Sequence, residues 1–393
     1  MSPGDATVDS GAPVVAVVGG GQLARMMAEP AAAMGIPLRL LAEAPGVSAA
    51  QVIPDHEVGD YTDLGTLRRL VDGCRVVTFD HEHVPTDHLH ALEEAGVAVR
   101  PGPDALVHAQ DKTVMRRSLS RFGAPMPRWT VANGLDDVVA FGLPCVIKTS
   151  RGGYDGKGVW IVRTPEEARP AFEAAAGPGV PLLVEELVEF RRELSALVAR
   201  SPSGQAAAYP VVESVQRNGI CHEVVAPAPG LSERLATQAQ ALALQIAREL
   251  DVTGVLAVEL FETSDDRILV NELAMRPHNT GHWTQDGAVT SQFENHLRAV
   301  LDLPLGTPVA RAPWTVMVNI LGGPAEQAGH LYDGYPHALA RDPGLRVHLY
   351  GKELRPGRKV GHVNAYGNDL QECLERARHA AAWFAGELGD ESE

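Results

Sequence analysis

The sequence predicts an α/β protein that begins with a doubly wound parallel sheet and continues as an α+β fold. In residues 12–102, short apolar runs alternate with segments of helical spacing, the pattern of parallel strands joined by helices. Further along, apolar segments are paired across polar or glycine-rich turns, as in antiparallel hairpins. The chain has 393 residues, 45% of them hydrophobic, which is enough for two or three domains with ample cores.

The first domain is predicted to cover residues 13–103, after a disordered leader at residues 1–12. Its expected elements are strands at 14–18, 38–42 and 75–79, and helices beginning near Gln22 and covering 63–71 and 85–95. The turn formed by Pro101, Gly102 and Pro103 marks the end of this domain.

Two further domains are predicted after that turn. Residues 104–305 are expected to form one α+β unit, which ends at a connector that contains Pro304 and Gly306. Residues 306–388 are expected to form a small α+β domain with strands near 314–320 and 346–349 and a last helix at 370–385, followed by an acidic tail at 389–393.

One predicted hairpin carries two acidic residues inside apolar strands. Strands at 255–261 and 268–273 flank a polar turn at 264–267, and a four-residue turn would place Glu259 opposite Glu272. Like charges at that spacing repel, so the pair needs a cation. Oxygen ligands suit Mg²⁺, with Mn²⁺ as an alternative, and Mg²⁺ completes its shell with water and substrate phosphates. The alternative interpretation is a shifted register with one carboxylate in solvent.

A second predicted hairpin, at residues 144–162, has four glycines in its loop. Glycine-rich turns can aim several backbone N–H groups at one anion. Lys148 ends the first strand and Lys157 lies in the loop, so both can provide positive charge for phosphate oxygens. No Gly-Lys-Ser/Thr opens a helix here, so this is not a Walker loop. The segment is interpreted as a flap over a nucleotide, and the alternative is an ordinary mobile hairpin.

The turn Gly19, Gly20, Gly21 before the first helix fits the dinucleotide fingerprint, with Glu43 after the second strand. On this feature alone, a nicotinamide-dependent oxidoreductase is a fair alternative. However, a helix N-terminus binds any phosphate, and this function would leave the flap and the acidic hairpin without a role.

The composition excludes some partners. Lys and Arg number 34 against 50 Asp and Glu, a formal net charge of −16, which argues against nucleic acid and anionic membranes. The four cysteines are scattered, as expected for reduced thiols in a cytosolic protein. No apolar run approaches the length of a membrane span, and the first residues lack the pattern of a signal peptide. A cytoplasmic protein is therefore expected.

Five sequence blocks together resemble the N5-carboxyaminoimidazole ribonucleotide synthase family of ATP-grasp enzymes. The blocks are GGGQLARM at 19–26, TFDHEHV at 78–84, RGGYDGKG at 151–158, NELAMRPHNTGHWT at 271–284 and RPGRKVGH at 355–362. The resemblance runs from about Val14 to about Asn364. It implies an ATP-grasp fold with an N-terminal pre-ATP-grasp domain and a small C-terminal domain. It also implies a homodimer.

The activity implied by the resemblance is ATP-dependent carboxylation of 5-aminoimidazole ribonucleotide with bicarbonate in purine biosynthesis. ATP would convert bicarbonate into carboxyphosphate, whose carbon the amine of the ribonucleotide then attacks. The alternatives are another ATP-grasp ligase, such as the formate-dependent glycinamide ribonucleotide formyltransferase, and an inactive nucleotide sensor.

The resemblance also implies the residues that bind ATP and metal. The implied ATP contacts are Lys112, Lys148, Gly153, Tyr154, Asp155, Gly156, Lys157, Gly158, Glu185, Glu186, Leu187, Val188, Glu193, Gln216, Asn271 and Glu272. Glu259 and Glu272 are the metal ligands. Gln216 stands where family members often have histidine. For Glu185, Glu186 and Glu193, the alternative interpretation is a solvated acidic face.

The implied contacts of the ribonucleotide and bicarbonate come from several blocks. They are Gly21, Gln22, Leu23, Glu82, Arg276, His278, Asn279, His282, Lys352, Arg355, Arg358 and Lys359. Asp80 replaces the usual glutamate of the family. The basic run from Lys352 to Lys359 is interpreted as a clamp for phosphate and carboxylate, with a solvated face as the alternative. The predicted catalytic residues are Tyr154, Asp155, Arg276, Lys352 and Arg358, and Asp155 is the candidate proton acceptor.

Overall fold

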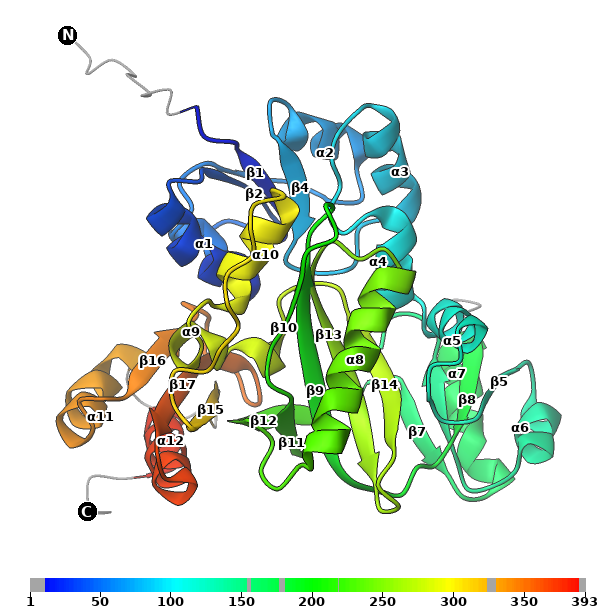
Figure 1. Ribbon diagram of the computed structural model, residues 1–393. Coiled ribbons are helices and arrows are strands. Elements are labelled where there is room, and N and C mark those ends of the chain that lie inside the picture. The colour runs from blue at the N-terminus through cyan, green and yellow to red at the C-terminus, as the bar shows by residue number, and fades with distance from the viewer. Residues whose placement is uncertain (1–10, 154–156, 177–180, 218, 324–329, 389–393) are drawn as a thin grey trace, which may run out of the picture. The chain divides into compact units, whose positions relative to one another are not determined.

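The computed structural model describes residues 11–153, 157–176, 181–217, 219–323 and 330–388, and Figure 1 shows their helices and strands. The chain divides into two compact units, Met1–Arg100 and Pro101–Glu393. Residues 1–10 of the predicted leader and the predicted acidic tail lie outside the described residues.

The first unit contains a four-stranded parallel sheet in the order β3-β2-β1-β4. Its strands are β1 (Val15–Val18), β2 (Leu38–Ala42), β3 (His56–Val58) and β4 (Val76–Phe79), and its helices are α1 (Gln22–Met34), η1 (Ala49–Gln51), α2 (Leu64–Val71) and α3 (Thr86–Glu94). The predicted parallel sheet and its three strands are confirmed. The prediction missed β3 because this strand has only three residues and no buried side chain, so it has no apolar signal.

The second unit contains a small antiparallel sheet in the order β5-β8-β6-β7. Its strands are β5 (Trp129–Ala132), β6 (Cys145–Thr149), β7 (Val159–Val162) and β8 (Leu182–Glu186), and the helices beside it are α6 (Leu135–Phe141), η2 (Pro165–Ala168) and α7 (Arg169–Ala176). The predicted glycine-rich hairpin is confirmed, because β6 pairs with β7 from Cys145 and Val162 to Lys148 and Val159. Buried apolar residues from β6 and β8 pack with α6 and α7 on one face of the sheet.

The second unit also contains a nine-stranded sheet in the order β14-β13-β9-β11-β12-β15-β17-β16, with β10 beside β9. Its strands are β9 (Phe190–Arg200), β10 (Ala206–Ala208), β11 (Val212–Arg217), β12 (Ile220–Ala226), β13 (Gly254–Thr263), β14 (Ile268–Ala274), β15 (Trp314–Leu321), β16 (Arg346–Leu349) and β17 (Lys359–Gly367). Because β12 pairs with β15, the C-terminal strands continue the same sheet, and the predicted domain boundary at 305 falls inside this unit.

The remaining helices cover this large sheet or precede the small one. They are α4 (Pro103–Gln110), α5 (Lys112–Arg121), α8 (Glu233–Glu249), η3 (Asn279–Gly281), α9 (Thr284–Gly287), α10 (Gln292–Val300), η4 (Leu331–Gly334), α11 (Tyr335–Arg341) and α12 (Leu370–Phe384). Helices α8 and α10 pack on β9 and β13, and α12 packs on β15 and β17 (Figure 1). The Ser232 hydroxyl caps α8 at Leu235 N–H, and the Asp369 carboxylate caps α12 in the same way.

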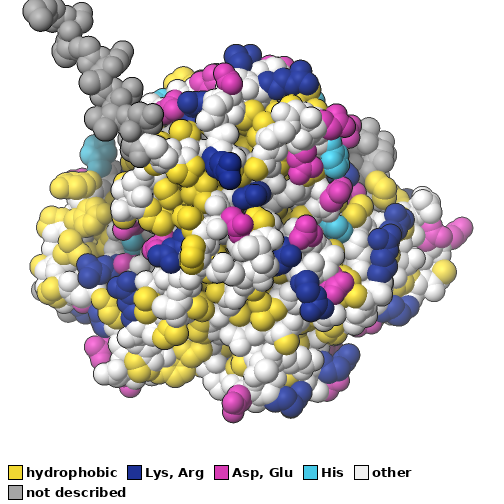
Figure 2. Space-filling view, turned by 45° about the horizontal axis from the view of Figure 1, so that its top comes forward, with side chains coloured by type: hydrophobic (Ala, Val, Ile, Leu, Met, Phe, Trp, Pro, Cys, Tyr) yellow, Lys and Arg dark blue, Asp and Glu magenta, His cyan; other side chains and the backbone are white. Residues whose placement is uncertain are grey.

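The surface carries both signs of charge. On the face shown in Figure 2, lysine and arginine side chains are scattered among acidic ones instead of gathered in one area. In the part of the chain that the structure describes, no helix has both the length and the apolar character needed to cross a membrane.

Candidate active site

A cavity of about 460 Å³ lies within the second unit, and both of its sheets contribute side chains to the lining. Strands β6 and β7 supply Val146, Lys148, Val159 and Ile161. Strands β13 and β14 supply Glu259, Phe261, Asn271 and Glu272. Segments around β8, β9 and η3 provide most of the rest: Glu185, Glu186, Leu187, Val188, Phe190, Glu193, His278, Asn279 and Thr280.

Glu259 and Glu272 face each other across β13 and β14, as predicted, and both line the cavity. The predicted four-residue turn is wrong. Thr263 N–H donates to the Arg267 carbonyl at 3.0 Å, so only three residues lie in the loop, and Asp266 has a φ of +59°. The pairing therefore starts one residue out of the predicted register. A bulge between Glu259 and Leu260 then restores it.

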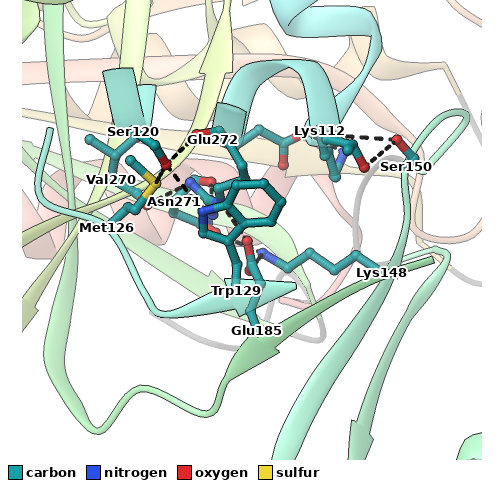
Figure 3. A network of polar contacts seen from close by, with 12 residues as sticks. Lys112, Ser120, Met126, Trp129, Lys148, Ser150, Glu185, Val270, Asn271 and Glu272 are labelled. Atoms are coloured by element: carbon teal, nitrogen blue, oxygen red, sulfur yellow. Dashed lines mark hydrogen bonds and ion pairs between the residues drawn. The ribbon is translucent and has the colours of Figure 1, made fainter. Parts of the chain in front are cut away.

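The bulge places two adjacent side chains at the cavity. Successive residues of a regular strand point to opposite faces, but Asn271 and Glu272 both line it. Lys148 Nζ donates to Asn271 Oδ1 at 3.0 Å, and Lys112 Nζ lies 2.7 Å from Glu272 Oε1 (Figure 3). Two lysines and two carboxylates therefore converge at one end of the cavity, as phosphate and metal binding require.

A buried ion-pair network holds Lys148 in place. The carboxylate of Glu185 is 2% exposed and binds Arg116 Nε through Oε1. Its Oε2 lies 2.8 Å from Lys148 Nζ (Figure 3). Burial opposes ionisation of Glu185, but the charges and hydrogen bonds of Arg116 and Lys148 outweigh it and lower the pKa to about 2. The carboxylate is thus already paired, and it positions Lys148 in the cavity.

Arg116, which has no exposed surface, also holds the acidic strand. Its guanidinium donates to the carbonyl oxygens of Val270 and Asn271, at 3.0 and 2.8 Å. Helix α5 therefore fixes both the lysine of β6 and the backbone at the bulge of β14.

The base of the flap is tied to the start of α5. The Asp111 carboxylate accepts from Thr113 N–H and Val114 N–H as the helix cap. The same carboxylate accepts from Ser150 Oγ at 2.6 Å and from Arg151 Nε at 2.8 Å. Lys112, the first residue of α5, is therefore fixed relative to the root of the flap.

The described ends of the flap loop lie close together. Thr149 N–H donates to the Gly158 carbonyl, and Gly158 has a φ of +72°. A side chain at Gly153 would meet the backbone of Lys157, so glycine is required there. Gly153, Lys157 and Gly158 are not part of the cavity lining. Tyr154, Asp155 and Gly156 lie outside the described residues.

Glu259 is held by a histidine. Thr280 N–H donates to His278 Nδ1, so Nε2 carries the ring proton and donates to Glu259 Oε1 at 3.2 Å. Burial disfavours the charged form of Glu259, but this bond and the positive charge of Lys359 outweigh it and lower the pKa. In contrast, burial and the nearby Glu259 raise the pKa of Glu193 to about 7.

Among the described residues, no group of three or more His, Cys, Asp or Glu side chains is placed to hold a metal by itself. Mg²⁺ does not need such a group, since it binds one or two carboxylates and completes its shell with water and substrate phosphates. Glu259 and Glu272 face each other at the end of the cavity that holds the two lysines, and their carboxylates would suit that ion.

The other end of the cavity is apolar. Val159, Ile161 and Phe190 are 39%, 50% and 45% exposed, which is high for large apolar side chains, and all three line it. The Phe190 and Phe261 rings stack with centroids 4.7 Å apart. Leu187 and Val188 complete this end. An apolar cavity end with stacked aromatic rings suits a nucleotide base.

Several predicted site residues lie outside the lining. Of the basic run, only Lys359 belongs to it. Lys352 Nζ lies 5.7 Å above the Tyr350 ring, and Arg355 pairs with Glu353 at 2.7 Å. Arg358 donates to the Glu353 carbonyl, and Arg276 donates to the Pro277 carbonyl. His282 is completely buried, and its Nδ1 accepts a hydrogen bond from Gln292 at 3.0 Å. Gln216 does line the cavity, beside a bulge of β11, and donates to Ser214 Oγ.

Two carboxylates flank the predicted phosphate turn of the first unit. Asp80 Oδ1 accepts from Ala24 N–H at 2.8 Å, in the first turn of α1, and a side chain at Gly21 would collide with Asp80. Glu43 Oε2 accepts from Gly20 N–H at 3.0 Å, so Glu43 supports the turn. Gln22 and Leu23 begin α1, and Glu82 follows β4 and is half-buried.

Sequence reasoning missed Arg116, Phe190 and Phe261. Arg116 lies four residues after Lys112 in α5, a spacing that places both on one helix face and is the only local signal for it. The two phenylalanines sit at strand positions that look like ordinary core.

Comparison with known proteins agrees with this geometry. Three family models match: a ribonucleotide synthetase preATP-grasp domain at residues 13–110, an ATP-grasp domain at 117–293, and a phosphoribosylaminoimidazole carboxylase C-terminal domain at 315–376. The ATP-grasp match covers most of the residues that line the cavity.

The chain is similar to N5-carboxyaminoimidazole ribonucleotide synthase of Mycobacterium tuberculosis, with 56% identity over 95% of this chain and 88% of the relative. Among solved structures, the synthetase of Thermus thermophilus is 39% identical with a TM-score of 0.84, over 96% of this chain and 100% of that one. The Aspergillus clavatus synthase in complex with ADP and 5-aminoimidazole ribonucleotide is 32% identical with a TM-score of 0.86, over 95% and 98% of the two chains.

Proposed function

Because the chain belongs to the N5-carboxyaminoimidazole ribonucleotide synthase family, we propose that it joins bicarbonate to the amine of 5-aminoimidazole ribonucleotide at the expense of ATP. The products are N5-carboxyaminoimidazole ribonucleotide, ADP and phosphate, in de novo purine biosynthesis. The enzyme is an ATP-dependent ligase that forms a carbon–nitrogen bond. The observation that carries the proposal is one cavity with an apolar end for a base and two lysines and two carboxylates at the other end.

ATP binds with its base at the apolar end and its phosphates toward Lys112 and Lys148. The base packs between β7 and the Phe261 side of the cavity, and the backbone at Leu187 and Val188 can read its edge. Glu193 lies where it can meet the ribose hydroxyls. The half-exposed apolar side chains of this end lose water when the base binds, which stabilises the complex.

Glu259 and Glu272 would hold Mg²⁺, with Mn²⁺ as an alternative, together with phosphate oxygens of ATP. When bound, the ion neutralises charge on the β- and γ-phosphates during phosphoryl transfer. Glu259 is kept ionised for this role by His278, and the phosphate charge is further balanced by Lys112 and Lys148.

The reaction then follows two displacements. An oxygen of bicarbonate attacks the γ-phosphorus, the bond to the β-phosphate oxygen breaks, and ADP leaves with carboxyphosphate formed. The amine nitrogen of the ribonucleotide attacks the carboxyl carbon, phosphate leaves, and the amine proton passes to a base, for which Asp155 is the candidate. The protein mainly positions the reactants and balances charge, while the flap keeps water from the labile intermediate, and Tyr154 is the second candidate catalytic residue of the flap segment.

The proposed function is tested by ADP release in a coupled assay with Mg²⁺, ATP and bicarbonate. Addition of 5-aminoimidazole ribonucleotide is expected to stimulate ADP release strongly, and other purine precursors are not. If formate and glycinamide ribonucleotide stimulate it instead, the ATP site remains and the substrate assignment is wrong.

The base-binding end gives a direct prediction for ATP affinity. Replacement of Ile161 by alanine should raise KM for ATP about fivefold, because roughly 1 kcal/mol of apolar contact is lost. The KM values for bicarbonate and the ribonucleotide should stay unchanged. Val139→Ala is the matched control, since Val139 is 52% exposed on α6 and does not line the cavity. Equal effects of the two variants in steady-state kinetics would contradict this placement of the base.

We propose that the turn at Gly21, Gln22 and Leu23 and the side chain of Glu82, all in the first unit, contact the ribonucleotide. Gly21→Ala pushes a methyl group against Asp80 and displaces the turn, so KM for the ribonucleotide is expected to rise about tenfold, as for loss of a charged hydrogen bond. KM for ATP should not change, because the ATP cavity is built entirely by the second unit.

The control for this prediction is Gly65→Ala in α2, where an added methyl group meets only ordinary contacts. An unchanged KM for the ribonucleotide in Gly21→Ala would remove the turn from the site.

The basic loop before β17, with Lys352, Arg355 and Arg358, is proposed to bind the phosphate and carboxylate groups of the substrates together with Arg276 and Lys359. The enzyme is further proposed to be a cytoplasmic homodimer without nucleic-acid or membrane partners. Analytical ultracentrifugation measures the oligomeric state directly.

A further inference from the structure

Two buried asparagines join the cavity to the C-terminal strands. Asn279, in η3, donates through Nδ2 to Asn319 Oδ1 at 3.1 Å, and Asn319 Nδ2 donates to Asn279 Oδ1 at 2.7 Å. Asn319 lies in β15 and is 2% exposed, while Asn279 is 9% exposed and lines the cavity. Asn319 Nδ2 also donates to the carbonyl oxygen of Cys221 in β12 at 2.9 Å.

The Cys221 carbonyl sets the orientation of both amides. A carbonyl oxygen only accepts hydrogen bonds, so the Asn319 atom that faces it must be the nitrogen. The other amide atom of Asn319 is then an oxygen, which requires a donor from Asn279. Asn279 must therefore place Nδ2 against Asn319 Oδ1 and direct its own oxygen to Asn319 Nδ2.

This arrangement leaves Asn279 with one N–H for a ligand. The side-chain oxygen of Asn279 accepts a hydrogen bond from Asn319 Nδ2. One of the two amide hydrogens of Asn279 is donated to Asn319 Oδ1. In the described part of the chain, the second hydrogen has no protein acceptor. If the Asn279 amide were rotated by a half-turn, its oxygen would face the oxygen of Asn319 and its NH₂ group would face the NH₂ group of Asn319. Each buried group left unpaired in this way costs about 1–3 kcal/mol.

We propose that Asn319 is a positioning residue that makes Asn279 a hydrogen-bond donor to an oxyanion at the polar end of the cavity. The proposal rests on the proposed function, in which two oxyanions meet at this end: bicarbonate and the γ-phosphoryl group. The γ-phosphoryl group offers only oxygen acceptors, and bicarbonate, which has one hydroxyl, carries its negative charge on two oxygens that only accept hydrogen bonds. An asparagine free to present its oxygen would repel them, so a locked amide favours binding of either one.

The test is steady-state kinetics of Asn319→Ala, with each substrate varied in turn. In this variant the orientation of the Asn279 amide is no longer fixed by Asn319. KM for either bicarbonate or ATP should therefore rise about tenfold or more, which is the effect of losing a hydrogen bond to a charged group, and KM for the ribonucleotide should stay unchanged. An increase for bicarbonate identifies bicarbonate as the partner of Asn279, and an increase for ATP identifies the phosphoryl group. If neither KM changes, the proposal is wrong.

Asn295→Ala is the matched control. Asn295 is a completely buried asparagine in α10, bonded to Tyr209 and Gly306 and not part of the cavity lining. Its truncation should lower the unfolding temperature as Asn319→Ala does, without changing any KM.

If Asn319→Ala does not fold, Asn319→Asp carries the same test. Its carboxylate is nearly isosteric and can accept from Asn279, but it cannot donate to Asn279 Oδ1 or to the Cys221 carbonyl. Failure of the proposed function is distinguishable, because it would appear in the wild-type enzyme as ADP release that the ribonucleotide does not stimulate.

Discussion

Replacement of Glu272 by glutamine is expected to lower kcat by about 10³-fold, the typical cost of removing one group that stabilises transition-state charge. Glutamine keeps the size of the side chain and can still accept from Lys112, so the local structure should persist. It removes one of the two opposed carboxylates that would bind Mg²⁺ at the phosphates. The loss should appear in ribonucleotide-dependent ADP release, and a higher Mg²⁺ concentration should recover part of it.

Asp265→Asn is the control on the same hairpin, because Asp265 lies in the exposed turn, where its carboxylate bonds to Thr263 and Arg267. Its activity should equal that of the wild type. Full activity of Glu272→Gln at limiting Mg²⁺ would mean that the metal binds elsewhere.

Replacement of Arg116 by methionine is expected to reduce the free energy of unfolding by about 3–5 kcal/mol, because it leaves the buried Glu185 carboxylate with one partner in place of two. The variant also leaves the carbonyls of Val270 and Asn271 without this donor. Urea unfolding at neutral pH measures the loss. Arg267→Met, at an exposed arginine on the nearby turn, should have little effect.

A double variant separates the ion pair from packing. With Glu185 changed to leucine as well, no unpaired carboxylate remains, so the combined loss should be smaller than the sum of the two single losses. Additive losses would show that Arg116 acts through packing alone.

The same network predicts an acid-sensitive stability. The pKa of Glu185 is about 2 in the folded protein and ordinarily 4.5, so its stabilising charge is fully present above the ordinary value. This contribution is lost as the pH falls toward the folded-state value. Glu185→Gln should therefore flatten the decline of stability between about pH 5 and pH 2, as measured by urea midpoints.

Local patterns were sufficient for much of the fold and part of the site. Short apolar runs located β1, β2 and β4 of the first unit, and apolar segments on either side of a turn located both hairpins of the ATP cavity. The opposition of Glu259 and Glu272 followed from counting residues across the turn. That count reached the right pair although the turn is one residue shorter, because the bulge at Asn271 compensates.

The remaining features depend on partners far apart in the sequence. Arg116 and Glu185 are 69 residues apart, and neither segment indicates that its charge will be buried against the other. The amide of Asn319 is oriented by a carbonyl 98 residues away. Strand β17 was missed because His362 and Asn364 interrupt its apolar pattern, yet both are completely buried in polar contacts.

Isotope transfer tests most directly whether ATP is consumed to phosphorylate bicarbonate. Bicarbonate labelled with heavy oxygen is supplied with ATP and 5-aminoimidazole ribonucleotide, and the phosphate product is analysed by mass spectrometry. Attack of a bicarbonate oxygen on the γ-phosphorus predicts that each phosphate released carries one labelled oxygen. Phosphate that carries no label would contradict carboxyphosphate formation and would mean that ATP activates a different group.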